Sequence, residues 1–307
     1  MNKIQARFKR ALRRLSRADP PPVPAVREII TGDPKLPPEL EREIFELVVA
    51  TDFPSDYWSH QHVGDTTLVL PQVCRRAQSW IEPFIYERVA LLQNYNGRDP
   101  FSSFLATVDA RPATFFAARV KHLYLDRMVP LYAVQRILSV CTSVVSFGCH
   151  HPYTALAPLL SSLPLTRLLV SEVSFPNPST PPRWSSTLTH LGLSSSLPAS
   201  ASTTLAHLPS LTHLAVDYSA LPDPEAPGIG SALTTFLIAV PHARYLVLLT
   251  GAKTEYRWAL QRLRDDAFVD KRVYVHLGPI GDAPWHAWSW RLPDCFEVAE
   301  KELQRRR

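Results

Sequence analysis

The residues of this chain whose types could most readily do chemistry are two cysteines and two histidines in mid-sequence. Cys149, His150 and His151 are consecutive, and Cys141 precedes them by eight positions. Thiolates and imidazoles are the usual ligands of a structural zinc ion. However, neighbouring residues on a strand point to opposite faces, and the spacing does not match that of known zinc patterns. We therefore expect these side chains to pack at the edge of a loop, and we expect no metal site.

A second group of possible ligands lies in one expected loop, at Asp56, His60, His62 and Asp65. Two histidines and two carboxylates could bind a metal ion, but no further His or Cys pair follows at a standard spacing. We interpret this segment as a surface loop.

Motifs of catalysis and nucleotide binding are missing from the sequence. There is no G-x-S-x-G nucleophile elbow, no H-E-x-x-H and no P-loop. Glycine is scarce, at 10 residues, whereas the phosphate-binding turns of nucleotide folds depend on it. We expect a non-enzymatic protein without a cofactor; the alternative is an enzyme whose site has no recognisable motif.

His190 and His213 are the candidate partner-binding residues. Each stands between a threonine and a leucine, in two similar stretches of sequence. The repetition gives them the same position in a structural repeat. That position is either simply solvent-facing or part of a polar stripe on a ligand-binding face, and the sequence favours neither.

The two histidines belong to a phrase that recurs along the chain. An apolar, helix-like run meets a proline and continues as L-x-x-L-x-hydrophobic, as in LSSLPLTRLLV and LAHLPSLTHLAV. The central apolar residues from Phe147 to Leu214 follow one another at steps of 21, 23 and 23, a period typical of leucine-rich repeats. We predict strands in one parallel sheet centred on these residues: Leu123, Phe147, Leu168, Leu191, Leu214, Leu246 and Val275.

Helix-like runs separate the expected strands, at 131–141, 154–163, 199–208, 229–240 and 254–267. Alternation of strands and helices indicates an α/β fold with a parallel sheet. The positions that hold asparagine or cysteine in regular leucine-rich repeats hold other residues here, so we expect a short, irregular leucine-rich-repeat-like solenoid. Those positions are Met128, Val173, Ser196 and Ser219.

A helical unit precedes the repeats. Two prolines open residues 36–49, where Leu40, Ile44, Phe45 and Val48 form one apolar face. A second helical segment is expected over 67–91, with a break or kink at Pro83.

This unit resembles the F-box of a large group of fungal F-box-like proteins. The opening L-P-x-E-L stands as Leu36, Pro37, Glu39 and Leu40, and the later V-C-R-R begins at Val73. Further matches are Trp80, Ile85 and Tyr86. The resemblance covers residues 36–91, and the repeats that follow match the usual F-box and leucine-rich-repeat layout.

The resemblance implies a protein-recognition subunit of a cullin-type ubiquitin ligase. Leu36, Pro37, Leu40, Ile44 and Val73 would present an apolar surface to the Skp-family adaptor of the cullin complex, while the repeats would hold an unknown protein substrate. The alternative is a structural or scaffold repeat protein in which the same helices only cap the solenoid. An adaptor site exposes these apolar residues, whereas a cap buries them.

Charge is concentrated at the N-terminus. Residues 1–17 contain 7 basic residues and no acid, and removing them from the 33 basic residues leaves 26 against 28 acidic residues. The remainder is close to neutral, so we expect no specific nucleic-acid binding. The basic segment is a solvated arm, a nuclear or anionic-surface address, or a mitochondrial presequence.

Cysteine usage and hydropathy indicate the compartment. The four cysteines show no C-x-x-C spacing, which favours a reducing environment, and no uncharged apolar run is long enough to span a bilayer. We expect a cytoplasmic or nuclear protein.

The expected organisation is a basic tail and proline-rich linker at 1–34, an F-box-like helical unit at 35–95, a leucine-rich-repeat-like domain at 96–283, and a C-terminal capping helix at 284–307.

Overall fold

The computed structural model describes residues 36–52, 65–91, 100–126, 128–171, 182–194, 205–218, 221, 229–277 and 295–305. The chain divides into two units, 1–41 and 42–307, and the division falls inside helix α2 (Pro38–Asp52). The basic tail, most of the expected loop at 51–65 and the expected helix start at 199–204 lie outside the described residues.

The helical region that precedes the sheet differs from its expected form. The segment expected as one helix over 67–91 consists of α3 (Asp65–Val73) and α4 (Arg75–Glu87), followed by strand β1 (Arg88–Leu91). Cys74 separates the two helices in an extended conformation, and its sulfur accepts a hydrogen bond from the Ala77 amide at 3.4 Å. Pro83 lies inside α4 and does not end it. The helix ends at Glu87 because the next four residues pair with the sheet and bury Val89 and Leu91.

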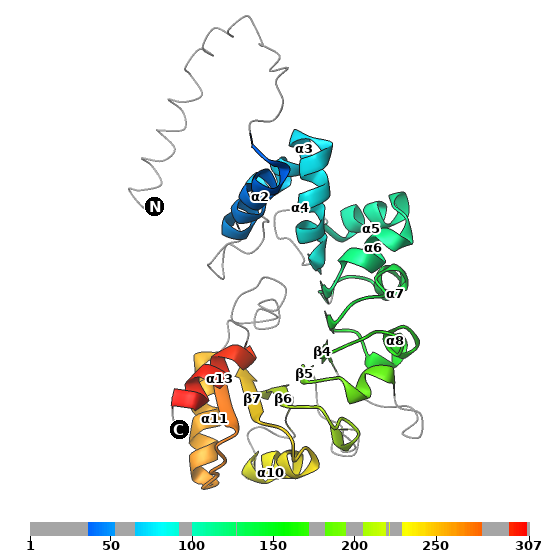
Figure 1. The fold of residues 1–307 in the computed structure, drawn as a ribbon. Helices are drawn as coiled ribbons and strands as arrows, with labels where there is room; N and C mark the ends of the chain where they lie inside the picture. The colour runs from blue at the N-terminus through cyan, green and yellow to red at the C-terminus, as the bar shows by residue number, and fades with distance from the viewer. Residues whose placement is uncertain are drawn as a thin grey trace, which may run out of the picture. The chain divides into compact units, whose positions relative to one another are not determined.

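The described part of the chain is α/β, and its eight strands form one parallel sheet in the order of the sequence, β1 to β8 (Figure 1). The predicted strand centres from Leu123 to Leu246 are direct partners in the sheet register. The last predicted centre, Val275, is the middle residue of β8, in which Val273 pairs with Leu246. The strands after β1 are β2 (His122–Leu125), β3 (Ser146–Cys149), β4 (Arg167–Val170), β5 (His190–Leu193), β6 (His213–Asp217), β7 (Tyr245–Thr250) and β8 (Val273–Leu277).

Prolines delimit the helices between the strands. Pro112, Pro130 and Pro152 occupy the N-cap positions of the helices that follow them, where the missing N–H costs nothing. Pro164 and Pro241 stand between a helix and the next strand. The helices after α4 are α5 (Pro100–Ala110), α6 (Ala113–Arg119), α7 (Leu131–Val140), α8 (Tyr153–Leu160), α10 (Ile229–Ala239), α11 (Lys253–Asp265) and α13 (Cys295–Arg305), with a 3-10 turn η2 (Arg183–Ser186).

Alternation along the strands gives the sheet two different faces. The first face packs against the connecting helices and forms the large core, to which each L-x-x-L-x-L phrase contributes its leucines, for example Leu191 and Leu193 of β5. The second face carries a smaller cluster that contains Tyr124, Leu169 and Ala215 of the sheet together with buried residues of α13. The C-terminal helix therefore lies against a face of the sheet, next to β7 and β8.

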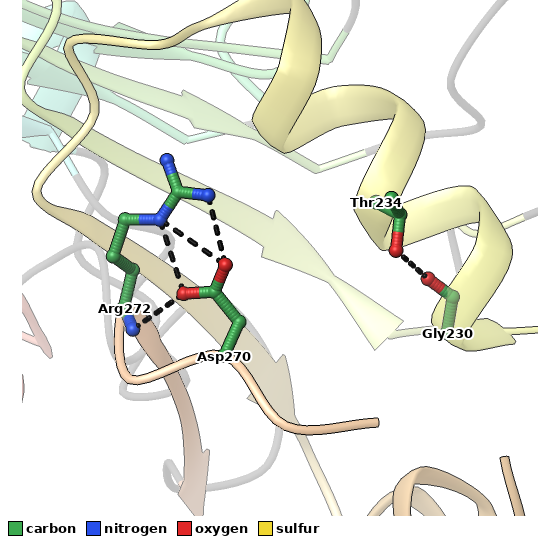
Figure 2. Close-up of polar contacts among 4 residues, drawn as sticks. All are labelled: Gly230, Thr234, Asp270 and Arg272. Carbon is green, nitrogen blue, oxygen red and sulfur yellow. Dashed lines mark hydrogen bonds and ion pairs between the residues drawn. The ribbon is translucent and has the colours of Figure 1, made fainter. Parts of the chain in front are cut away.

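The turn before the edge strand β8 is fixed by a local ion pair (Figure 2). The Asp270 carboxylate accepts from the Arg272 backbone N–H at 2.8 Å and from its guanidinium, with Nη2 2.8 Å from Oδ2. The hydrogen bond from Arg272 lowers the pKa of Asp270. On α10, the Thr234 hydroxyl donates to the Gly230 carbonyl at 2.7 Å, also drawn in Figure 2. The Asp270–Arg272 ion pair sets the start of β8, where the Arg272 carbonyl accepts a hydrogen bond from the Leu246 N–H at 2.8 Å.

Candidate interaction surfaces

The second face of the sheet carries polar and aromatic side chains at the first position of successive strands. This row follows from the register, since His122 pairs with Ser146, Arg167 with His190, and His213 with Tyr245. Parallel strands in register lie about 4.8 Å apart, so the side chains of neighbouring members of the row can touch. We name this set the polar row: His122, Ser146, Arg167, His190, His213 and Tyr245.

A ladder of threonine hydroxyls holds the two histidines of the polar row. The Thr189 hydroxyl donates to the Thr166 carbonyl at 3.0 Å, and the Thr212 hydroxyl donates to the Thr189 carbonyl at 3.2 Å. Each hydroxyl has only one proton. Each therefore accepts from the Nδ1–H of the histidine that follows it, at 2.8 Å in both cases. The ladder thus places the Nδ1 protons of His190 and His213 and fixes the orientation of both rings.

The two imidazoles form a parallel stack. Their ring centroids are 4.1 Å apart with an interplanar angle of 8°, and Tyr245 continues the stack beyond His213 at 4.9 Å and 26°. Burial, together with the charges of Arg167 and His213, lowers the pKa of His190 to about 2. His190 is therefore a neutral ring across the physiological range.

Helix α13 covers this stack. The Phe296 ring meets both imidazoles edge-on, with its centroid 5.1 Å from that of His190 and 5.5 Å from that of His213. One turn later, the Glu300 carboxylate lies 2.9 Å from His213 Nε2. Since Nδ1 donates to the Thr212 hydroxyl, Nε2 is the ring nitrogen that faces the Glu300 carboxylate.

The structure brings the two predicted partner-binding histidines into contact and buries one of them. His213 is 7% exposed, and His190 is partly buried. Their partners Phe296 and Glu300 were not predicted. The C-terminal segment was expected to be helical. Its contact with β5 and β6 could not be predicted, because the helical pattern of a segment does not show which distant part of the chain it packs against.

The five residues implied by the F-box resemblance are all exposed. In the first unit, Leu36 is 46% and Leu40 47% exposed, and Pro37 is also at the surface. In the second unit, Ile44 is 50% and Val73 63% exposed.

Helix α2 also contributes to a core contact within the second unit. Its residue Phe45 packs against Trp80 of α4, with ring centroids 6.0 Å apart. Phe45 of α2 therefore contacts α4, while its neighbour Ile44 remains exposed.

The cysteines and histidines at 141–151 are engaged in packing and local hydrogen bonds. Burial raises the pKa of the Cys141 and Cys149 thiols to about 12, so neither is a thiolate at neutral pH. His150 Nε2 lies 2.9 Å from the Tyr124 hydroxyl, and His151 Nε2 lies 2.7 Å from the Val129 carbonyl. Among the described residues, no group of three or more His, Cys, Asp and Glu side chains is placed to hold a metal ion.

The other possible metal group falls in the expected surface loop. Asp56, His60 and His62 lie outside the described residues, as does the side chain of Asp65.

In the part of the chain that the structure describes, no helix is both long and apolar enough to cross a bilayer.

Comparison of this chain with protein-family models, with curated proteins and with solved structures finds no match.

Proposed function

We propose that this protein is a non-enzymatic recognition subunit that resembles the F-box, leucine-rich-repeat receptors of cullin-type ubiquitin ligases. In this proposal the N-terminal helices bind a Skp-family adaptor, and the parallel sheet with its helices acts as a leucine-rich-repeat-like solenoid that holds a protein substrate. The resemblance of residues 36–91 to the F-box motif supports the first part. The near-constant spacing of the repeat phrase from Leu123 to Leu214 supports the second.

The observation that carries the proposal is the exposure of apolar side chains near the N-terminus. Of the twelve exposed large apolar residues in the described part of the chain, six fall between 36 and 73. An adaptor surface needs such residues in contact with water, whereas helices that only cap a repeat domain bury them. The six are Leu36, Leu40, Ile44, Leu47, Val69 and Val73.

The test is binding of the full-length chain to a purified Skp-family adaptor. We expect a complex that survives purification, and we expect Leu40→Asp and Ile44→Asp each to weaken it at least about tenfold, because a carboxylate would be buried in an apolar interface. Both side chains are about half exposed in the unbound chain, so neither change should shift the melting temperature appreciably.

The matched control is Ile238→Asp on α10, which places the same carboxylate at an apolar side chain that is 73% exposed. It should leave adaptor binding intact. A wild-type chain that captures no adaptor would defeat the ubiquitin-ligase proposal and favour the scaffold alternative. Equal losses with Ile238→Asp and Leu40→Asp would show that the effect is not specific to the N-terminal helices.

A further inference from the structure

Helix α13 is a short amphipathic segment seated on the second face of the sheet. Its buried residues Cys295, Phe296, Ala299 and Leu303 recur at helical spacing, and Lys301 is on its exposed side. A helix of eleven residues is marginal in water by itself. Its stability as a helix therefore depends on the surface that it covers.

The surface beneath α13 combines small side chains with hydrogen-bonding rings. Gly192 and Ala215 are register partners in β5 and β6, beside the stacked histidines. Small side chains there let a helix approach the sheet closely, and Ala299 of α13 is fully buried in the same cluster as Ala215. His213 then offers Nε2 to a carboxylate, and the edges of the histidine stack accept an aromatic ring.

The contacts of α13 are separate from the main core. Its buried residues belong to the small cluster of the second face, whereas the leucines of the repeats and the connecting helices form the large cluster on the first face. The two clusters share no residue, because the alternation of the strands directs them to opposite faces. Removal of α13 from the sheet would expose the second face and leave the large core closed.

We propose that this part of the second face is a docking site for an amphipathic helix of a partner protein, with an aromatic residue followed four positions later by a glutamate. Helix α13 occupies the site within the chain through Phe296 and Glu300, and the partner's helix must displace it. The inference names the kind of substrate segment for the recognition function proposed above and rests on that function. Its test uses no adaptor, so the two proposals can fail independently.

Release of α13 can be followed by the reactivity of Cys295 in the full-length chain. Cys295 is 2% exposed, and the exposed Cys74 is removed by Cys74→Ser. In that background we expect Phe296→Ala with Glu300→Gln to increase the labelling rate of Cys295 at least about tenfold. Glu300→Gln alone should give a smaller increase in the same direction, and Lys301→Gln on the exposed side should give none.

Cys141 and Cys149 serve as internal references, because both are buried beneath the first face. They should stay protected in every variant, even though loss of the buried Phe296 side chain lowers the melting temperature. If they became reactive together with Cys295, release of α13 would require unfolding of the core, and the proposal would be wrong. Unchanged Cys295 reactivity in the double variant would also overturn it.

The partner class is tested with a fluorescent peptide of residues 295–305 that carries Cys295→Ser. The peptide should bind the double variant at least about tenfold more tightly than the parent chain, whose site is occupied by its own helix. The same peptide with Phe296→Ala and Glu300→Gln should not bind. Failure of the first peptide to bind the double variant, or equal binding of both peptides, would overturn the assignment of this face as a helix site.

Discussion

His190 and His213, at equivalent positions of two neighbouring repeats, stack as parallel rings with their centroids 4.1 Å apart. They are paired by the register of β5 and β6, and the threonine that precedes each one fixes its ring. The repeat in the sequence therefore produces the same hydrogen bond, between a threonine hydroxyl and the next histidine, in two successive strands. The hydroxyls of Thr166, Thr189 and Thr212 donate to the carbonyls of Val145, Thr166 and Thr189, so a threonine ladder connects repeats that lack the asparagine of regular leucine-rich repeats.

The threonine ladder should contribute measurably to stability. Thr189→Val keeps the shape of the side chain but removes the donor to the Thr166 carbonyl and the acceptor of His190 Nδ1–H. We expect a loss of about 1–3 kcal/mol in the free energy of unfolding, measured by urea denaturation at neutral pH. The control is Thr235→Val on α10, whose exposed hydroxyl bonds only the preceding turn and whose loss should cost less than about 0.5 kcal/mol. Equal costs would mean that the ladder has no special role.

Burial of His190 should make the fold sensitive to mild acid. Its pKa is lowered from 6.5 to about 2, so below pH 6.5 the unfolded chain binds a proton at this ring and the folded chain does not. Stability is therefore lost as the pH falls, by at most about 1.4 kcal/mol per pH unit, or on the order of 2 kcal/mol between pH 6.5 and 4.5.

This pH dependence is checked by urea unfolding of the wild type and His190→Gln over the same range. The variant lacks the titrating ring, so its stability should fall less steeply with acid than that of the wild type. His207→Gln, at an exposed histidine, should follow the wild-type curve. Superimposable curves for the wild type and His190→Gln would contradict the assignment.

The leucines of the repeat phrase should carry much of the core energy. Leu191 is fully buried in the large cluster, so Leu191→Ala should reduce the free energy of unfolding by about 2–5 kcal/mol through lost burial and the cavity left behind. Val269→Ala, at a side chain that is 89% exposed, should change it by less than about 0.5 kcal/mol. A small effect at Leu191 would mean that its environment collapses around the shorter side chain.

The central strands could be predicted from sequence because both their signals are local and repeated. The alternation of leucines assigns the buried face, and the near-constant spacing from Phe147 to Leu214 assigns the register. The last strand has no such phrase. Val275 is nevertheless the middle residue of β8, as predicted, and Val273 points to the same face and pairs with Leu246.

Strand β1 was missed because four residues are too few to separate a strand from the end of a helix. Val89 and Leu91 alternate as a strand requires, but they follow the helical pattern of α4 without a glycine or proline between them. The cover over the histidine stack was also beyond prediction. The position of Phe296 is set by contacts on the second face of the sheet, and its helical pattern does not identify which side of the protein it meets.

The close packing of Gly148 under the Tyr124 ring gives the last prediction. A Cβ at position 148 would lie 2.7 Å from Tyr124 Cδ2, and the ring has little room to move because it is 2% exposed and its hydroxyl bonds His150. Gly148→Ala should therefore cost about 1–3 kcal/mol of unfolding free energy. Gly251→Ala is the matched control, since a Cβ there meets Glu255 Oε2 at an ordinary 3.6 Å. A double-mutant cycle identifies the cause: in a Tyr124→Ala background the cost of Gly148→Ala should largely disappear, whereas an unchanged cost would assign it to the backbone of β3.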